Sequence, residues 1–139
     1  MKNTKQPIAL IVGGSSGMGF ESAKLLLQRD IKTVIVGRNL DKLNKASKAL
    51  SEFGDVSTIQ ADLYNQDDVQ SIIEFANNND LHIKYLLNSA GYFKPKPFVD
   101  HDNNDFDIYH ELNRAIFFIS QAVAKNMIVN DGGAIVNIG

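Results

Sequence analysis

The fold is decided by the stretch from Ile8 to Gly19, which reads I-A-L-I-V-G-G-S-S-G-M-G. Apolar residues lead directly into a cluster of glycines and serines, and the residues after Gly19 take up helical spacing. The simplest interpretation is a buried parallel strand, a tight turn and the start of a helix. Such a junction directs backbone N–H groups and the positive end of a helix dipole at one point, which favours a phosphate group.

The composition indicates one ordinary globular domain over residues 1–139, with 44% hydrophobic and 22% charged residues. The net charge of −2 gives no reason to expect nucleic acid or an anionic membrane as a partner. A small molecule or another protein is expected instead. The chain has no cysteine, which excludes disulfides and a thiolate nucleophile. The N-terminal residues M-K-N-T-K-Q-P are followed by only five apolar residues, too few for a signal segment or a membrane span, so a cytoplasmic location is expected.

Further along the chain, short apolar runs alternate with amphipathic segments. Residues 92–100 contain Pro95 and Pro97 and are predicted to form a loop. The last amphipathic segment predicts a long helix of roughly 20 residues around positions 106–123. Strands are predicted at 8–12, 33–36, 56–60, 83–87 and 134–138, and the earlier helices at about 16–29, from 40 to near 54, and from 65 to about 76.

This alternation predicts the α/β class, with a doubly wound, Rossmann-type parallel sheet in the strand order 3-2-1-4-5. All five strands are interpreted as apolar runs that are buried on both faces. Ligands of such sheets bind at the carboxyl ends of the strands. The unusual residue clusters follow four of the predicted strands: Gly13–Gly19, Gly37–Asn39, Asp62-Leu63 and Asn88–Gly91.

The glycines at 13, 17 and 19 have a spacing close to, but different from, the G-x-G-x-x-G fingerprint of dinucleotide sites. In both patterns glycine permits a tight turn, close approach of a phosphate, and close packing of helix on strand. A P-loop is rejected because Phe20 follows Gly19 where a lysine is required. A purely structural glycine turn is the alternative.

The residue after the second strand addresses the choice of cofactor. An acidic residue there accepts hydrogen bonds from a ribose 2′-hydroxyl, whereas an arginine accommodates a 2′-phosphate. Here Gly37 is followed by Arg38, and no acid is present. The guanidinium can bind phosphate oxygens and stack on adenine. NADP(H) is therefore favoured over NAD(H), with a solvated surface arginine as the alternative.

Two further positions allow two interpretations each. Asp62 can contact an adenine amino group or serve only as a turn residue before the next helix. Asn113 is interpreted as a buried helical asparagine that either satisfies backbone groups or holds a water molecule. The three histidines are isolated from one another and from acidic clusters, so no metal site is expected.

Six segments in this order resemble the short-chain dehydrogenase/reductase family over essentially the whole chain. They are V-G-G-S-S-G-M-G (12–19), G-R-N (37–39), D-L (62–63), N-S-A-G (88–91), L-N-R (112–114) and G-G-A-I-V-N-I (132–138). The resemblance implies hydride transfer between NAD(P)(H) and a carbonyl or alcohol substrate. It also implies a homo-oligomer formed through the 106–123 helix.

The resemblance implies a role for individual residues. Asn113 matches the family's catalytic asparagine, which holds a water in the proton relay. Arg38 is assigned to the 2′-phosphate, Asp62 and Leu63 to adenine, and the remaining positions to the pyrophosphate turn and the cofactor's edge. The predicted cofactor-binding residues are Gly13, Ser15, Ser16, Gly17, Met18, Gly19, Arg38, Asn39, Asp62, Leu63, Asn88, Ala90 and Gly91.

The sequence departs from the family pattern at three places. Val12 and Ser89 replace a usual threonine and a usual asparagine, without loss of an expected cofactor contact. The third departure concerns Gly139, which takes the first of two serine positions, and the family's later Tyr-x-x-x-Lys pair has no counterpart. Tyr92 and Lys96 have that spacing but lie in the proline-containing loop.

The first hypothesis is therefore the cofactor-binding part of an NADP(H)-dependent reductase, truncated and inactive alone. The alternatives are a non-catalytic NADP(H)-binding or assembly module, and an α/β domain without a ligand.

Overall fold

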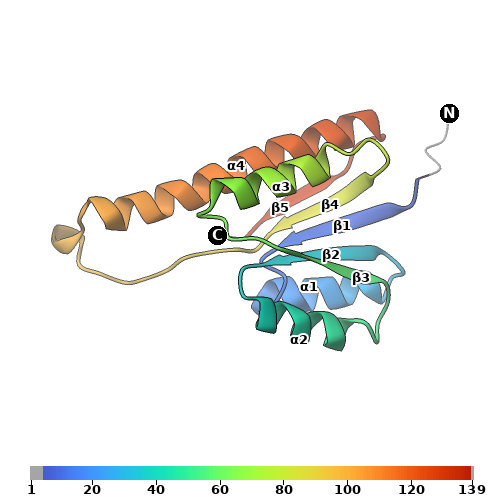
Figure 1. The fold of residues 1–139 in the computed structure, drawn as a ribbon, viewed down its shortest axis with the longest axis horizontal. Helices are drawn as coiled ribbons and strands as arrows, with labels where there is room; N and C mark the ends of the chain where they lie inside the picture. The colour runs from blue at the N-terminus through green and yellow to red at the C-terminus, as the bar shows by residue number, and fades with distance from the viewer. Residues whose placement is uncertain (1–4, 139) are drawn as a thin grey trace.

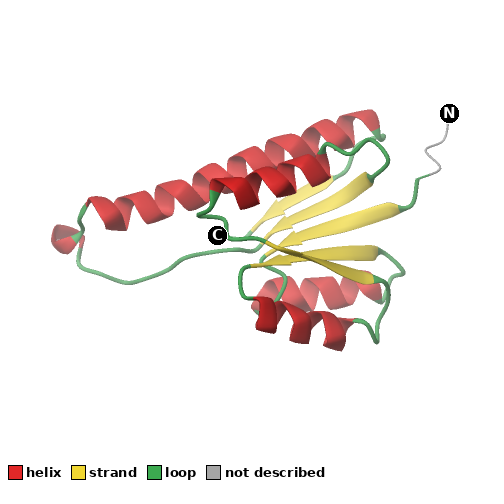
Figure 2. Cartoon of the chain, viewed as in Figure 1, coloured by secondary structure: helices red, strands yellow, loops and turns green. Residues whose placement is uncertain are grey.

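The computed structural model describes residues 5–138, and these form one five-stranded parallel sheet with helices on both faces (Figures 1 and 2). The predicted strand order is confirmed as β3-β2-β1-β4-β5. The elements are β1 (Pro7–Val12), α1 (Gly17–Leu27), β2 (Lys32–Gly37), α2 (Leu40–Leu50), β3 (Val56–Gln60), α3 (Gln66–Ala76), β4 (His82–Asn88), the 3-10 turn η1 (Phe98–Asp100), α4 (Asn103–Val129) and β5 (Ala134–Asn137).

The two faces of the sheet have separate apolar cores. Figure 1 shows α1 and α2 on one face and α3 and α4 on the other. Successive side chains of β1 point to opposite faces. Leu10 therefore packs with Ile119 of α4, whereas Ile11 packs with Leu27 of α1 and Leu43 of α2. This central strand is almost fully buried, which fixes the position of the glycine turn that follows it.

Three of the four α-helices begin with a side-chain cap. The side chain of Asn39 accepts a hydrogen bond from the Lys42 amide, and that of Asn65 accepts one from the Asp68 amide. Asp102 and Asp105 form a reciprocal capping box at the start of α4. These polar residues end the preceding loops and fix where each helix starts.

The expectation that all five strands are buried on both faces is wrong for the two edge strands. The residues of β3 are half-buried or exposed, and all four residues of β5 are exposed. The sequence of β3, V-S-T-I-Q, has polar residues between its apolar ones, which suits an edge strand with one solvated face. No described element covers the outer edge of β5.

The predicted helix boundaries also need correction. Helix α4 has 27 residues rather than roughly 20, because the Asp102 cap starts it early and the apolar spacing continues to Val129. Helices α1 and α2 end at Leu27 and Leu50, before the predicted ends at 29 and near 54. The loop over 92–100 is confirmed, with a single 3-10 turn at its end.

A buried asparagine ties the start of β4 to α4. The Asn126 side chain accepts a hydrogen bond from the Ile83 amide (2.9 Å) and donates one to the Leu81 carbonyl (2.9 Å). The neighbouring Asn130 side chain donates to the Asn126 carbonyl (2.8 Å). This network lies at the amino-terminal ends of the strands. The carboxyl-terminal ends, on the opposite side of the sheet, therefore remain open for a ligand. Within residues 5–138, no helix has both the length and the apolar character needed to cross a membrane.

Candidate nucleotide-binding site

The glycine turn after β1 is tightly packed against β2 and β4. The amides of Gly13 and Gly14 both donate to the Val36 carbonyl, at 2.9 and 3.1 Å. Gly13 has a φ of +87°, and a Cβ there would lie 2.6 Å from the Ala90 amide nitrogen. A Cβ on Gly19 would collide with the Gly13 carbonyl oxygen. Glycine is therefore required at 13 and 19 by the local packing.

Helix α1 differs from the other three α-helices because its first turn has no side-chain cap. Ser16 is the N-cap residue, and its side chain makes no capping hydrogen bond. The first turn also lacks an acidic residue. The amides of this turn have no intrahelical acceptor. They point, with the positive end of the helix dipole, to the edge of the sheet where a phosphate can accept their hydrogen bonds.

A cleft of about 410 Å³ lies at this edge of the sheet. Its walls come from the glycine turn and from the carboxyl ends of β2, β3 and β4. Ten of the predicted cofactor-binding residues line it: Gly13, Ser15, Ser16, Gly17, Met18, Arg38, Asp62, Leu63, Ala90 and Gly91. The structure therefore brings together, around one cleft, residues from four separate segments of the chain.

Three other predicted cofactor-binding residues do not line the cleft. Gly19 is buried inside the glycine turn, where it permits the close packing of α1. Asn39 caps α2, and its side-chain oxygen is already used by the Lys42 amide. Asn88 is 2% exposed and donates to Ser120 Oγ (3.0 Å) and Asn137 Oδ1 (2.7 Å). Asn88 thus ties β4 to β5 and α4 behind the cleft.

The Asn113 side chain is exposed, so the expectation of a buried helical asparagine is wrong. It lies on a different groove from the nucleotide cleft, between α4 and β5, together with Ser120 and Asn137. Its neighbour Leu112 lines the nucleotide cleft instead. Gly139, which takes one of the family's serine positions, lies outside the described residues.

Sequence reasoning missed several residues that line the cleft, including Ser89, Tyr64 and Tyr92. Tyr64 directly follows Asp62-Leu63, and Tyr92 directly follows the N-S-A-G segment. Their position next to two predicted segments was the available signal. Burial raises the pKa of the Tyr64 phenol, an effect that the positive charge of Arg38 partly offsets. Arg38 itself is exposed at the rim of the cleft.

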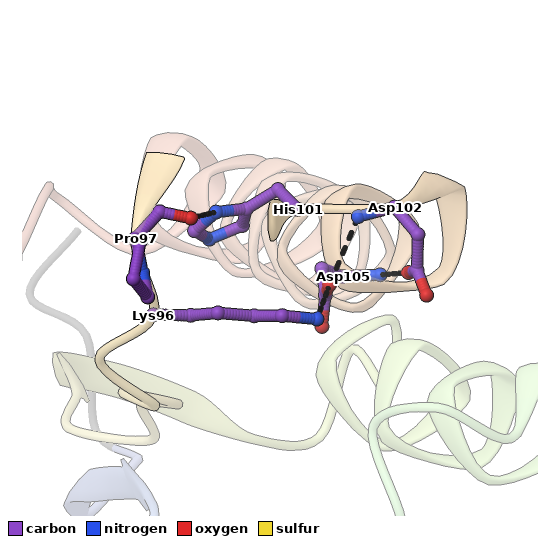
Figure 3. A network of polar contacts seen from close by, with 5 residues as sticks. All are labelled: Lys96, Pro97, His101, Asp102 and Asp105. Carbon is purple, nitrogen blue, oxygen red and sulfur yellow. Dashed lines mark hydrogen bonds and ion pairs between the residues drawn. The ribbon is translucent and has the colours of Figure 1, made fainter. Parts of the chain in front are cut away.

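The segment that leaves the cleft after Gly91 is fastened to the start of α4. Figure 3 shows Lys96 reaching Asp105, at 2.5 Å, beside the capping box that Asp105 forms with Asp102. The rings of Tyr92 and Tyr109 also make an edge contact, with centroids 5.3 Å apart. The hydrogen bond from Lys96 lowers the pKa of Asp105 to about 2. These contacts position Tyr92 at the cleft.

The cleft has several features that suit a dinucleotide. A Cβ at Gly17 or Gly91 would meet no protein atom within 4 Å, so the backbone at both positions faces open space that a ligand can approach closely. The uncapped amides of α1 suit a pyrophosphate, and Arg38 suits a further phosphate. Among residues 5–138 there is no group of three or more histidine, aspartate or glutamate side chains that could hold a metal.

Comparison with known proteins agrees with this geometry. Residues 7–139 match the family model described as short chain dehydrogenase. The chain belongs to the short-chain dehydrogenase family. It is thereby a member of an enzymatic family of oxidoreductases.

Relatives of this short-chain dehydrogenase chain include the carbonyl reductase family member 4 of Xenopus laevis, 33% identical over 95% of this chain and 55% of that protein. Gluconate 5-dehydrogenase of Gluconobacter oxydans is 34% identical over 94% of this chain and 52% of its own length. A solved short-chain dehydrogenase from Sphingobium yanoikuyae in complex with NADPH is 31% identical, has a TM-score of 0.88, and is matched over 96% of this chain and 53% of its own. The chain spans about half the length of the curated relatives it matches.

Proposed function

We propose that this chain is the cofactor-binding part of an NADP(H)-dependent reductase or dehydrogenase that acts on a carbonyl or alcohol substrate. The observation that carries the proposal is the uncapped first turn of α1, which opens into a cleft lined by ten residues of the predicted site. A bound nicotinamide dinucleotide would supply the hydride that reduces a carbonyl, or accept the hydride that an alcohol loses. The Sphingobium protein, which matches 96% of the present chain, was solved in complex with NADPH.

The residues around the cleft have distinct proposed roles toward the dinucleotide. The first-turn amides of α1 hold the pyrophosphate, and Ser15 and Ser16 lie beside them. Arg38 binds the 2′-phosphate, which favours NADP(H) over NAD(H). Asp62 and Leu63 contact adenine. The Asp62 Oδ1 atom already accepts a hydrogen bond from the Tyr64 amide (3.0 Å), so its second oxygen is the one proposed to contact the adenine amino group.

The chemical step requires groups that we do not assign within residues 5–138. The family's serine, tyrosine and lysine have no counterpart among them, and Asn113 is the one catalytic position proposed here. We therefore propose that the chain binds cofactor but does not reduce a carbonyl by itself. We also propose a cytoplasmic location.

Binding calorimetry with NADPH, NADH and adenosine 2′,5′-bisphosphate tests the proposal. We expect NADPH and adenosine 2′,5′-bisphosphate to bind, and NADH to bind at least tenfold more weakly than NADPH, because it lacks the phosphate that Arg38 holds. Tighter binding of NADH would contradict the role of Arg38. Absence of binding by all three would instead support an α/β domain without a nucleotide ligand.

The open face of α4 and β5 favours a second candidate, a non-catalytic module that binds NADP(H) and assembles with another chain. All residues of β5 are exposed, and Phe117 and Ile135 line the groove beside it. A free strand edge next to apolar side chains promotes association. The proposed homo-oligomer through positions 106–123 uses part of the same face.

A further inference from the structure

Tyr64 lies at the boundary between two hollows of the surface. One is the nucleotide cleft, and the other is a groove of about 320 Å³ between α3 and α4. Leu63 and Tyr64 are the residues that line both. Tyr64 therefore bounds the nucleotide cleft on the side that faces α3 and α4.

The backbone at Tyr64 is held in place by its neighbours. Its amide donates to Asp62 Oδ1 at 3.0 Å, and the Asn65 amide donates to the Asp62 carbonyl at 2.9 Å. The Asp62 amide in turn donates to Asp68 Oδ2 at 2.9 Å, in the first turn of α3. The turn between β3 and α3 is therefore fixed at both ends. Because the backbone of this turn is fixed, the directions that the Tyr64 side chain can take are restricted by the fold.

The surroundings of the Tyr64 hydroxyl come from three strand ends. Arg38 follows β2, Asp62 follows β3, and Tyr92 follows β4, and all three affect the ionisation of Tyr64. Burial is the largest effect, and it raises the pKa of Tyr64 above 10.0. Glu111 of α4, which lines the groove between α3 and α4, also raises the pKa of Tyr64, as Asp62 and Tyr92 do, whereas Arg38 lowers it. The phenol is neutral near pH 7, as a tyrosine with the ordinary pKa also is, and its proton is available as a hydrogen-bond donor.

We propose that Tyr64 is a binding residue for the adenosine half of the nucleotide, with its ring packed on the adenine base and its hydroxyl donating a hydrogen bond to the nucleotide. The inference rests on the proposed function. Arg38 and Tyr64 follow adjacent paired strands, and both line the cleft. A planar guanidinium and an aromatic ring are the two side-chain groups best suited to pack on a base.

The test compares Tyr64→Ala and Tyr64→Phe with Tyr85→Phe as the matched control. Tyr85 is half-buried in β4 and lines none of the described clefts. The ligand is adenosine 2′,5′-bisphosphate, measured by calorimetry, because it contains the adenosine half without nicotinamide. We expect Tyr64→Ala to weaken binding about tenfold, the usual cost of losing one aromatic–base contact. Tyr64→Phe is expected to lose about threefold, and Tyr85→Phe nothing.

Two further measurements separate contact with the ligand from a structural role. Thermal unfolding without ligand shows whether each variant folds. In the wild-type chain, NMR signals of the tyrosine rings are followed during titration with adenosine 2′,5′-bisphosphate, and the Tyr64 signal is assigned from its absence in Tyr64→Phe. We expect the Tyr64 ring to shift and the Tyr85 ring to stay unchanged. This readout remains valid even where Tyr64→Ala does not fold.

The outcomes distinguish this inference from the function on which it rests. The role of Tyr64 is overturned, and the nucleotide site left intact, by either of two results. One is that the wild-type chain and Tyr64→Ala bind adenosine 2′,5′-bisphosphate with equal affinity. The other is that the Tyr64 ring signal does not shift in the saturated wild-type complex. Absence of binding by the wild-type chain overturns both the site and the inference.

Discussion

At the scale of single residues, the glycine turn is governed by distances that leave no room for a side chain. Gly13 lies so close to Ala90, and Gly19 so close to Gly13, that a Cβ on either glycine would displace backbone atoms. Gly17 and Gly91, by contrast, face open space. The glycines around the cleft therefore fall into two groups: those at 13 and 19 are required by close packing, and those at 17 and 91 leave space that a ligand can approach.

Gly19→Ala is expected to destabilise the chain by about 3 kcal/mol, since its Cβ would collide with the Gly13 carbonyl. Urea denaturation measures the change. Gly91→Ala is the matched control and is expected to change the free energy of unfolding by less than about 0.5 kcal/mol. An equal effect of both substitutions would show that close packing at Gly19 is not the cause.

Arg38→Gln is expected to weaken NADPH binding about tenfold to a hundredfold while leaving NADH binding unchanged, because only NADPH carries the 2′-phosphate. Calorimetry with the two cofactors gives the ratio. Arg29→Gln removes the same charge from an exposed position just beyond α1 and should leave both affinities as they are. Parallel losses for NADPH and NADH would indicate that Arg38 contacts a part common to both.

At the scale of elements, the segment between β4 and α4 depends on the pair Lys96 and Asp105. The hydrogen bond from Lys96 keeps the pKa of Asp105 at about 2, below the ordinary value of 3.8. A carboxyl group with a lowered pKa in the folded state stabilises the fold above its ordinary pKa. That contribution is lost as the pH falls from about 4 towards 2.

Lys96→Met should therefore raise the pKa of Asp105 towards its ordinary value, although the bond from the Asp102 amide still lowers it in part. NMR titration of the Asp105 carboxyl carbon between pH 1.5 and 6, a range of roughly two units on either side of the ordinary pKa, follows the change. Lys94→Met is the control, since Lys94 is exposed and its backbone bond to the Tyr109 hydroxyl is retained. An unchanged Asp105 titration in Lys96→Met would disprove the pairing.

The contact between α4 and the start of β4, at the amino-terminal ends of the strands, depends on Asn126. Replacing it by alanine leaves the Ile83 amide and the Leu81 carbonyl without this partner in a buried position, which is expected to cost about 2 kcal/mol. Lys125→Ala, one residue away on the exposed side of α4, should change the free energy of unfolding by less than about 0.5 kcal/mol. Urea denaturation compares the two, and equal stabilities would contradict the role of Asn126.

At the scale of the whole molecule, the open α4–β5 face is the surface on which association is expected. Phe117 is 61% exposed there, beside the free β5 edge. We predict concentration-dependent association in sedimentation velocity, and its reduction by Phe117→Lys. Leu25→Lys makes the same change at a residue of α1 that is 58% exposed, on the other face of the sheet, and should have no effect. A monomer at every concentration would contradict this prediction.

The order and direction of the strands could be predicted from sequence because buried central strands need long apolar runs, as β1 and β2 have. The exposure of β5 could not be predicted from hydrophobicity alone, since β5 is apolar but has no described neighbour on its outer edge. The polar residues within β3, by contrast, do indicate an edge strand. The early start of α4 depends on a cap among several acidic residues, and only the structure shows that Asp102 provides it.

The candidate site was partly predictable for the same reason. Residues that directly follow strands must meet at one edge of a parallel sheet, so Gly13, Arg38, Asp62 and Ala90 were found. The side-chain directions of Asn39 and Asn88 depend on hydrogen bonds to α2, α4 and β5, which one-dimensional spacing does not contain. Tyr64 was missed because it lies between the nucleotide cleft and the groove of α3 and α4, and the sequence pattern does not show that groove.

The central position of β1 has a consequence for how the chain folds. Its two neighbours are β2, which follows soon after it, and β4, which is separated from it by β2, β3 and the three helices between them. Pairings between distant segments close large loops and slow folding. During synthesis, one edge of β1 therefore has no partner until β4 has left the ribosome. We expect nascent chains that stop before residue 82 to remain protease-sensitive, and those that include α4 to become resistant.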